Sequence, residues 1–205
     1  NSGGRQMPAH WGHKELNIVS QSSCTGTQHL QAAGAAEVGH IMREIAELKD
    51  KTDLYKNDEV VYVSIGDGAA SQGEVWEAIG TASTFKLPVI FMIEDNGYAI
   101  SVPSSEQVHG GSMSEAVVGF KNLYITEYDG CDPIASYVEA KKAVEYARAG
   151  HGPALLHAHV VRPYSHSMSD DETMYRPEAE RDADRERDPV YSFPKFLIAE
   201  GILDE

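Results

Sequence analysis

Two short apolar runs with a helical pattern between them dominate the middle of the chain. The runs are residues 60–65 (VVYVSI) and 89–93 (VIFMI), and both are rich in β-branched side chains. Such runs are typical of strands that are buried on both faces of a parallel sheet. The apolar residues between them recur at the helical period and predict a helix with one apolar face: Val75, Ala78, Ile79, Ala82 and Phe85. Ser71 and Glu74 have the spacing of a capping box, so we expect this helix to begin near Ser71.

The rest of the chain continues this alternation of strands and helices. A helix rich in small residues is expected from Gln28 to about Lys49, with Thr27 as its N-cap. Further strands are expected at residues 123–127 and 155–161, and further helices at 134–149, 177–188 and 192–200. Residues 1–18, 50–58 and 109–118 have the composition of loops and connectors. The alternation indicates one α/β domain over residues 1–205, with a doubly wound, mostly parallel sheet.

Composition narrows the classes of function. The 205 residues carry a formal net charge of −15, from 32 acidic residues against 17 Lys and Arg. This balance makes non-specific binding to nucleic acid unfavourable. Two cysteines give no disulfide framework and suit a reducing compartment, and no apolar run has the length of a membrane span. The chain begins without Met and shows no signal peptide, so we expect its true N-terminus to precede these residues.

Polar residues follow both apolar runs at the points where the strands should end. Gly66-Asp67-Gly68 follows the first run, and Asn96 follows the second. Neighbouring parallel strands end at one edge of a sheet, and open α/β sheets bind ligands at that edge. The Asp67 carboxylate, the Asn96 amide oxygen and the Tyr98 carbonyl would leave room around Mg²⁺ for phosphate oxygens. Flanking glycines and a helix N-terminus suit a phosphate, so the sequence predicts a metal–diphosphate site.

Other interpretations of these motifs are weaker. Gly-Asp-Gly on its own is a common turn and Asn-Gly a common hairpin turn, but Pro103 interrupts the strand that a hairpin at Asn96 would need. A nicotinamide cofactor is the sharper rival, because Glu94 ends the second run where a ribose-binding acid belongs. However, the G-x-G-x-x-G motif of nicotinamide-cofactor sites has Ser71 in place of its third glycine here. In addition, the Asp67 carboxylate would face a pyrophosphate without a counterion. A metal ion removes that repulsion.

These residues also resemble a known family. Gly-Asp-Gly, followed by an Asn that closes the next strand, resembles the thiamine diphosphate motif. The wider run GDGAASQGEVWEAIGTASTFKLPVIFMIEDNGYAISVPSSEQ is similar to the α subunit of decarboxylating 2-oxo acid dehydrogenases, closest to the branched-chain type. By this resemblance Asp67, Asn96 and the Tyr98 carbonyl hold Mg²⁺, and the diphosphate is contacted by Gly66, Gly68 and Ala69. Glu94 departs from the pattern at the position of a phosphate contact, because the branched-chain enzymes carry Arg there.

The resemblance also covers the N-terminal part of the chain. GRQMPAHWGHKELNIV (residues 4–19) matches the family segment GRQMP-x-H-aromatic-G, although the family's preceding Tyr-Arg phosphate clamp is not in these residues. Ser23, Cys24 and Thr25 take the position at which the family contacts the aminopyrimidine ring. Glu37 lies inside the expected helix at a position that is not acidic in the family, so we reject it as the catalytic glutamate. In the family the β subunit supplies that glutamate.

The run RPYSHSMSDDETMYR, after the last expected strand, contains a candidate catalytic histidine. His166 can donate or accept a proton near neutral pH, although a solvated loop histidine explains this loop alone equally well. The run strongly resembles the mobile loop that lines the active-site mouth in the family. By that match His166 is the catalytic histidine at the cofactor, and Arg162 contacts the cofactor phosphate. Ser167 lies where mitochondrial relatives are phosphorylated.

Two histidine pairs lie outside these motifs. His10 and His13 have metal-ligand spacing, and His157 and His159 alternate on one face of the last expected strand. The first pair can ligate a metal ion and the second can bind zinc, but such sites need three or four ligand groups. Because no third ligand is evident nearby in the sequence, we interpret His10 and His13 as surface or hydrogen-bonded residues. For the same reason we interpret His157 and His159 as a hydrogen-bonded pair that is buried or half-exposed.

The resemblance implies a function for the chain. It implies oxidative decarboxylation of a 2-oxo acid, of the branched-chain type, with thiamine diphosphate and Mg²⁺ and with acyl transfer to a lipoyl group. It also implies a β subunit or fused β part, a lipoyl-bearing acyltransferase, and the bacterial cytoplasm or mitochondrial matrix as compartment. The α subunit of pyruvate or acetoin dehydrogenase and a non-catalytic diphosphate-binding assembly subunit are the alternatives. The side chain of the 2-oxo acid is not readable here, since the partner contributes to that specificity.

Overall fold

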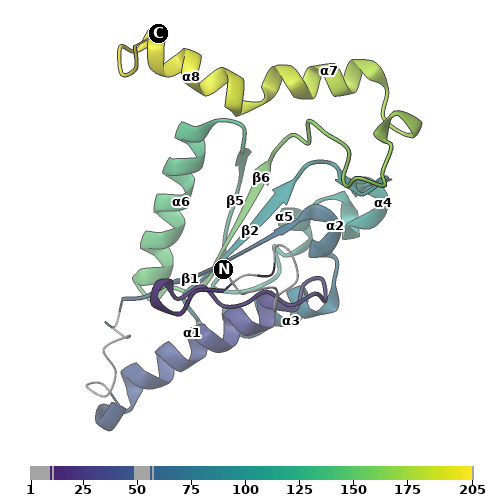
Figure 1. Ribbon diagram of the computed structural model, residues 1–205. Helices are drawn as coiled ribbons and strands as arrows, with labels where there is room; N and C mark the ends of the chain where they lie inside the picture. Colours follow the sequence, from purple (N-terminus) through teal and green to yellow (C-terminus); the bar gives the residue numbers. More distant parts are fainter. Residues whose placement is uncertain (1–9, 11, 49–55, 57, 205) are drawn as a thin grey trace.

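The fold is built on a sheet of four parallel strands. The computed structural model describes residues 10, 12–48, 56 and 58–204. The strands are β1 (Val61–Gly66), β2 (Val89–Asp95), β5 (Tyr124–Asp129) and β6 (Ala154–His159), and they lie in the order β1-β2-β6-β5 (Figure 1). All neighbouring pairs are parallel. The predicted α/β fold with a parallel sheet is confirmed.

Helices cover both faces of this sheet. α1 (Gln28–Glu44) and α3 (Gly73–Phe85) pack on one face, and α6 (Pro133–Arg148) packs on the other (Figure 1). In β2, the side chains of Val89, Phe91 and Ile93 enter the core on the α1 and α3 side, while Ile90 enters the core under α6. Burial on both faces explains why the sequence of β2 is an unbroken apolar run.

The start of α3 differs from its prediction. The helix begins at Gly73, and Gln72 takes the N-cap position without a side-chain hydrogen bond. Ser71 does not cap the helix, because its Oγ donates to the distant carbonyl of Gln107 at 2.8 Å. A separate helical turn, α2 (Asp67–Ala70), fills the space between β1 and α3. The predicted capping box is therefore wrong, although the helix itself is confirmed.

The apolar face of α3 is confirmed except at its last position. Val75, Ala78, Ile79 and Ala82 are fully buried, but Phe85 is 58% exposed. Lys86, the next residue, is left-handed at φ +53° and ends the helix there. Phe85 therefore lies in the final turn, beyond the core.

The small residues of α1 allow it to pack closely. Ala32, Ala33 and Ala36 are buried against α3 and β1, whereas Gly34 and Ala35 are exposed. The helix ends at Glu44 and a short 3₁₀ turn follows (Ala46–Leu48), so the end expected near Lys49 lies outside the described residues. The predicted connector at residues 50–58 lies largely outside them, and so does the first half of the loop predicted at residues 1–18. The described part of that loop contains a 3₁₀ turn (Lys14–Leu16) and an antiparallel bridge between His13 and Ile18.

His29, in the first turn of α1, is a buried histidine without a hydrogen-bond partner for its ring among the described residues. Its ring stacks on Phe91 with 5.9 Å between centroids. Burial away from water lowers the pKa of His29 to about 4. The ring is therefore neutral at pH 7 and packs as an apolar aromatic group.

Residues 98–117 contain several short elements, and the last of them lie in the segment 109–118 that the sequence predicts to be a loop. β3 (Tyr98–Ala99) and β4 (Val102–Pro103) form a small antiparallel pair, and α4 (Ser104–Gln107) follows them. A 3₁₀ turn (His109–Gly111) and α5 (Met113–Ala116) then replace the loop expected at residues 109–118. Two features stabilise α5: Ser112 caps it through the N–H of Glu115, and Met113 is buried. The loop prediction for residues 109–118 is therefore wrong.

α7 (Glu178–Arg187) and α8 (Pro189–Ala199) form an arm beyond the carboxyl ends of the strands (Figure 1). α7 has no buried residues, so the prediction of a solvent-exposed charged helix is confirmed. α8 begins earlier than predicted, because Asp188 caps it by accepting from the N–H of Val190 at 2.9 Å. In the part of the chain that the structure describes, every helix is too short or too polar to cross a membrane.

Candidate functional site

The ends of β1 and β2 bring the two predicted motifs together. The strands are neighbours, and Gly66 at the end of β1 pairs with Glu94 near the end of β2. Asp67 follows β1 directly, and its Oδ1 accepts a hydrogen bond from the backbone N–H of Asn96 at 3.4 Å. The predicted juxtaposition is confirmed, and the ligand that these residues hold stays a prediction.

Asp67 is a buried carboxylate that is held by neutral donors. The residue is 2% exposed, and its Oδ2 accepts from Ser104 Oγ at 2.5 Å. Within the described residues no Lys, Arg or His forms an ion pair with it. A buried carboxylate without a positive partner is unfavourable in free energy. The residues present therefore fit a divalent cation at this edge of the sheet.

The turn after β2 presents further oxygens beside Asp67. Asn96 Oδ1 accepts from the N–H of Tyr98 at 3.2 Å, and Gly97 has a φ of +82°, which favours glycine. An amide oxygen has two lone pairs, so Asn96 keeps one for a cation. The turn therefore leaves Asn96 able to serve as a metal ligand while holding the backbone of Tyr98.

Gly68 is required by packing inside the protein. A Cβ at this position would lie 2.3 Å from the Cβ of Ala99, so α2 packs directly on β3. At Gly66, by contrast, the nearest atom to an added Cβ would be the carbonyl oxygen of Glu94 at 3.9 Å. We attribute the need for glycine at position 68 to the close contact between α2 and β3. At Gly66 there is open space in which a ligand can approach the backbone. Ala69, the third predicted contact, packs partly buried against the core.

The loop with Ser23, Cys24 and Thr25 lies against the start of α3. These three residues are exposed, and the following Gly26 packs so closely that an added Cβ would lie 3.0 Å from Gln72 Cβ. The loop thus lies near the edge that carries Asp67. Ser23 Oγ is also 3.1 Å from His10 Nε2. His13 Nδ1 accepts from the N–H of Leu16, so the interpretation of His10 and His13 as hydrogen-bonded residues is confirmed.

Arg162, just after β6, reaches back to the turn after β2. Its Nη1 donates to the carbonyl of Ile100 and its Nη2 to the hydroxyl of Tyr175, each at 2.8 Å. The guanidinium carbon lies 5.7 Å from the centre of the Tyr98 ring. Arg162 Nε is buried and has no partner among the described residues. The group is therefore fixed beside Tyr98 with donor capacity to spare for an anion.

His166 is exposed in the segment between β6 and α7. Its backbone N–H donates to Asp170 Oδ2 at 2.9 Å, which holds the loop, and the residue is exposed to solvent. Nothing among the described residues bonds the ring, and no contact joins it to Asp67. The structure therefore leaves the His166 side chain accessible to solvent and does not bring it into contact with Asp67. The neighbouring Ser167 is exposed as well, with its Oγ 3.3 Å from Ser169 Oγ.

Arg176 anchors the segment that carries Arg162 and His166, and sequence reasoning missed it. The residue is 3% exposed and forms ion pairs with Glu172, Glu180 and Asp184. It also donates to the carbonyl of Arg162 at 2.9 Å. Burial opposes its charge, but the hydrogen bonds to Glu180 and Asp184 outweigh this and raise its pKa. The spacing of Glu172, Arg176 and Glu180, four residues apart, was the available signal.

Replacement of Arg176 by Met is expected to release this segment. The change removes one partner from a buried ionic network, which typically costs about 3–5 kcal/mol of stability. Hydrogen exchange in the assembled enzyme should then become faster at residues 162–176. Arg185→Met is the matched control, because Arg185 pairs with Asp182 on the exposed face of α7, the helix that carries Glu180 and Asp184. Unchanged protection of residues 162–176 in Arg176→Met would contradict the anchoring role.

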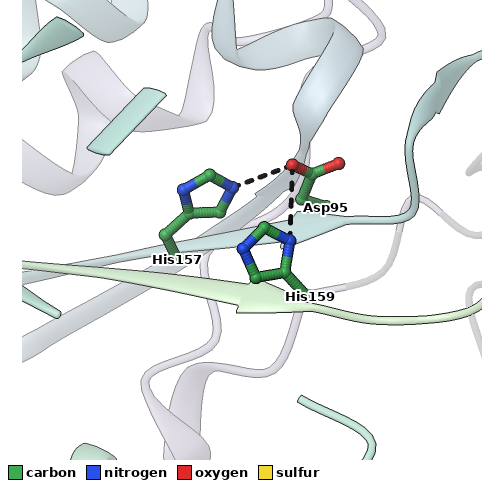
Figure 2. Close-up of side chains that lie close together, drawn as sticks. All are labelled: Asp95, His157 and His159. Carbon is green, nitrogen blue, oxygen red and sulfur yellow. Dashed lines mark hydrogen bonds and ion pairs between the residues drawn. The ribbon is translucent and has the colours of Figure 1, made fainter. Parts of the chain in front are cut away.

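A second polar cluster lies at the same edge of the sheet, and sequence reasoning missed its third and fourth members. Figure 2 shows the rings of His157 and His159 turned toward the carboxylate of Asp95. Glu127, on β5, contacts His159 at 2.6 Å. Burial raises the pKa of Asp95, but hydrogen bonds from His157 and Gly97 outweigh it and leave the pKa below its ordinary value. Hydrogen bonds from Ser114 and His159 likewise lower the pKa of Glu127.

Ser104 links the two clusters. Its Oγ lies 2.5 Å from Asp67 Oδ2 and 3.3 Å from Asp95 Oδ1. Parallel register accounts for the second cluster, since Asp95 pairs with His159 and Glu127 pairs with His157. Ser104 lies 37 residues after Asp67 and 9 after Asp95 in the sequence, and no motif predicts its position between them.

Comparison with known proteins identifies the family. The family model described as "Dehydrogenase E1 component" matches residues 1–205. The chain belongs to this family. The dehydrogenase E1 component chain is 37% identical, over its whole length, to the 2-oxoisovalerate dehydrogenase subunit alpha of Bacillus subtilis, of which the match covers 58%.

Two further relatives of this E1 component chain come from a mitochondrial and a bacterial enzyme. The human mitochondrial 2-oxoisovalerate dehydrogenase subunit alpha is 36% identical over 98% of the chain and 42% of that protein. The Staphylococcus aureus pyruvate dehydrogenase E1 component subunit alpha is 34% identical over 98% of the chain and 50% of that protein. The E1 component chain thus spans about half the length of the curated relatives it matches, and those relatives include bacterial and mitochondrial proteins.

Proposed function

We propose that this chain is the α part of a thiamine-diphosphate- and Mg²⁺-dependent 2-oxo acid dehydrogenase that acts on a branched-chain 2-oxo acid. The observation that carries the proposal is the buried Asp67 carboxylate, which meets the Asn96 turn across the ends of β1 and β2 and lacks an ion-pair partner among the described residues. Membership of the E1 component family supports the same activity. Residues 1–205 would form one cofactor-binding domain.

The cation and the diphosphate would be held by residues at this edge. Asp67, the Asn96 amide oxygen and the Tyr98 carbonyl would bind Mg²⁺, and Gly66, Gly68 and Ala69 would lie along the diphosphate. Arg162 would contact a phosphate, which its buried and unpartnered Nε favours. Ser23, Cys24 and Thr25, beside the start of α3, would approach the aminopyrimidine ring. When bound, thiamine diphosphate supplies the carbanion stabilisation that decarboxylation of a 2-oxo acid requires.

His166 and the protein partners would complete the chemistry. The exposed His166 ring would donate or accept a proton as the acyl group passes to a lipoyl group. Glu37 is exposed on α1, which agrees with its rejection as the catalytic glutamate. A β subunit or fused β part would supply that group, and a lipoyl-bearing acyltransferase would receive the product. The compartment would be the bacterial cytoplasm, or the mitochondrial matrix in a eukaryote.

Rates on a panel of 2-oxo acids test the substrate proposal. The full-length chain, assembled with its β partner, thiamine diphosphate and Mg²⁺, should have its highest kcat/KM on branched-chain 2-oxo acids. Pyruvate is the second candidate, favoured by the Staphylococcus aureus relative. A preference for pyruvate would overturn the branched-chain assignment. Absence of decarboxylation of every acid would favour the non-catalytic assembly subunit instead.

A further inference from the structure

Asp95, His157 and His159 place three metal-ligating atoms together outside the proposed Mg²⁺ site. Asp95 ends β2, and both histidines come from the neighbouring strand β6. Asp95 Oδ2 lies 2.9 Å from His157 Nε2 and 3.9 Å from His159 Nδ1, and Figure 2 shows both rings directed at that oxygen. The three ligand atoms lie within 4.8 Å of one another. Asp95 is therefore the third ligand, which could not be identified near the histidine pair in the sequence.

The contacts of His159 leave two acceptors facing each other. His159 Nε2 lies 2.6 Å from Glu127 Oε1, and a carboxylate can only accept, so Nε2 carries the hydrogen. In the neutral ring Nδ1 then presents a lone pair toward Asp95 Oδ2, across 3.9 Å. This separation is too long for a hydrogen bond. A cation between the two atoms would satisfy both.

The contacts of His157 lead to the same arrangement. Ser114 Oγ lies 2.5 Å from Glu127 Oε2, so its one hydrogen is donated to that carboxylate. Ser114 Oγ must then accept from His157 Nδ1, at 2.9 Å. A hydrogen bond from His157 Nε2 to Asp95 Oδ2, across 2.9 Å, therefore needs a second proton on the ring. A metal ion between these two atoms would take the place of that proton.

We propose that Asp95, His157 and His159 form a binding site for Zn²⁺. Zinc bonds of about 2.0–2.1 Å in tetrahedral geometry place ligand atoms roughly 3.3 Å apart, and the two observed separations from Asp95 Oδ2 bracket that value. Two imidazoles and a carboxylate are a typical zinc ligand set that leaves a fourth position for water. Binding would displace any second proton from His157.

The surroundings have the features of a metal site. Each histidine is oriented by a partner on its other nitrogen, Ser114 for His157 and Glu127 for His159, as is usual for metal-ligating imidazoles. The carboxylate of Asp95 is fixed by the N–H of Gly97 at 2.8 Å. The His157 side chain is 2% exposed and that of His159 is 46% exposed. A cation therefore has a route to the site past His159.

Zinc binding to the assembled enzyme tests this site. The full-length chain with its β partner would be stripped of metal and dialysed against Zn²⁺ in excess Mg²⁺, which occupies the oxygen-ligand site at Asp67. The enzyme should retain one zinc per chain. His159→Ala should lower the zinc affinity by more than about 100-fold, and Glu127→Gln by about 10- to 100-fold through loss of ring orientation. His151→Ala, a histidine outside the cluster, is the control and should bind as the parent does.

His159 is the decisive variant because its half-exposed ring can be removed with little effect on folding. Circular dichroism of each variant would verify the fold, and His157→Gln would add a second test at the buried ligand. Equal zinc retention by the parent and by His159→Ala would overturn the proposal. So would a parent enzyme that takes up no zinc, since the cluster would then be a hydrogen-bonded network with a second proton on His157. Neither outcome would touch the function proposed for Asp67, because Mg²⁺ fills that site throughout.

Discussion

Replacement of Asp67 by Ala is expected to abolish Mg²⁺-dependent thiamine diphosphate binding by the assembled enzyme. Asp67 would supply the only formal negative charge among the three proposed metal ligands. Its loss should lower the cofactor affinity by more than about 100-fold, beyond the effect usual for a residue that only orients a ligand. Isothermal titration of thiamine diphosphate with and without Mg²⁺ measures this directly.

Two controls separate loss of the metal ligand from loss of the fold. Asp67→Asn keeps the size of a side chain that is 2% exposed and removes only its charge, so it should lose binding while remaining folded. Asp182→Ala removes a carboxylate paired with Arg185 on the exposed face of α7 and should bind as the parent does. Cofactor affinity that is unchanged in both Asp67 variants would remove the metal assignment.

Replacement of His166 by Ala is expected to affect catalysis after the cofactor has bound. The His166 ring is exposed and makes no contact with Asp67 in the described residues, so Mg²⁺ and cofactor affinity should stay nearly unchanged. Reductive acylation of a lipoyl acceptor should fall by roughly 10²–10⁴, the usual range for a positioned acid–base group. Decarboxylation measured with an artificial electron acceptor should fall less, because that route bypasses transfer to the lipoyl group.

A structural role for His166 predicts a different pattern. Both activities would then fall together, along with cofactor affinity or folding. Met168→Ala is the control within the same segment, because Met168 is fully exposed. The catalytic assignment would have to be abandoned if His166→Ala showed the structural pattern, or if it matched Met168→Ala in every measurement.

The central strand–helix–strand unit could be predicted from the sequence because its signals are local. The apolar runs at β1 and β2 reflect burial on one or both faces, and the motifs at their ends meet because parallel neighbours end at one edge. Asp67 and Asn96 were therefore placed together correctly. The prediction of a capping box at Ser71 is wrong because the Ser71 hydroxyl bonds the carbonyl of Gln107 and not a backbone N–H of α3.

The parts that were missed depend on partners far apart in the chain. Arg176 ends the run RPYSHSMSDDETMYR, and its spacing to Glu172 and Glu180 does not show that all these groups and Tyr98 meet around its guanidinium. His157 and His159 lacked a third ligand because Asp95 lies on a different strand, 62 residues before His157. Asp95 meets the two histidines because β2 and β6 are neighbours in the order β1-β2-β6-β5 and are paired in this register. No local sequence pattern specifies that strand order.

The identity of the bound cofactor tests the central claim most directly. The full-length chain would be assembled with its β partner, incubated with cell extract so that it takes up its cofactor, and washed. The enzyme would then be denatured and the released small molecules measured by mass spectrometry. We predict thiamine diphosphate and Mg²⁺ in equal amounts, both lost together from Asp67→Asn. A nicotinamide dinucleotide in their place, or no thiamine diphosphate retained by the parent enzyme, would contradict the account.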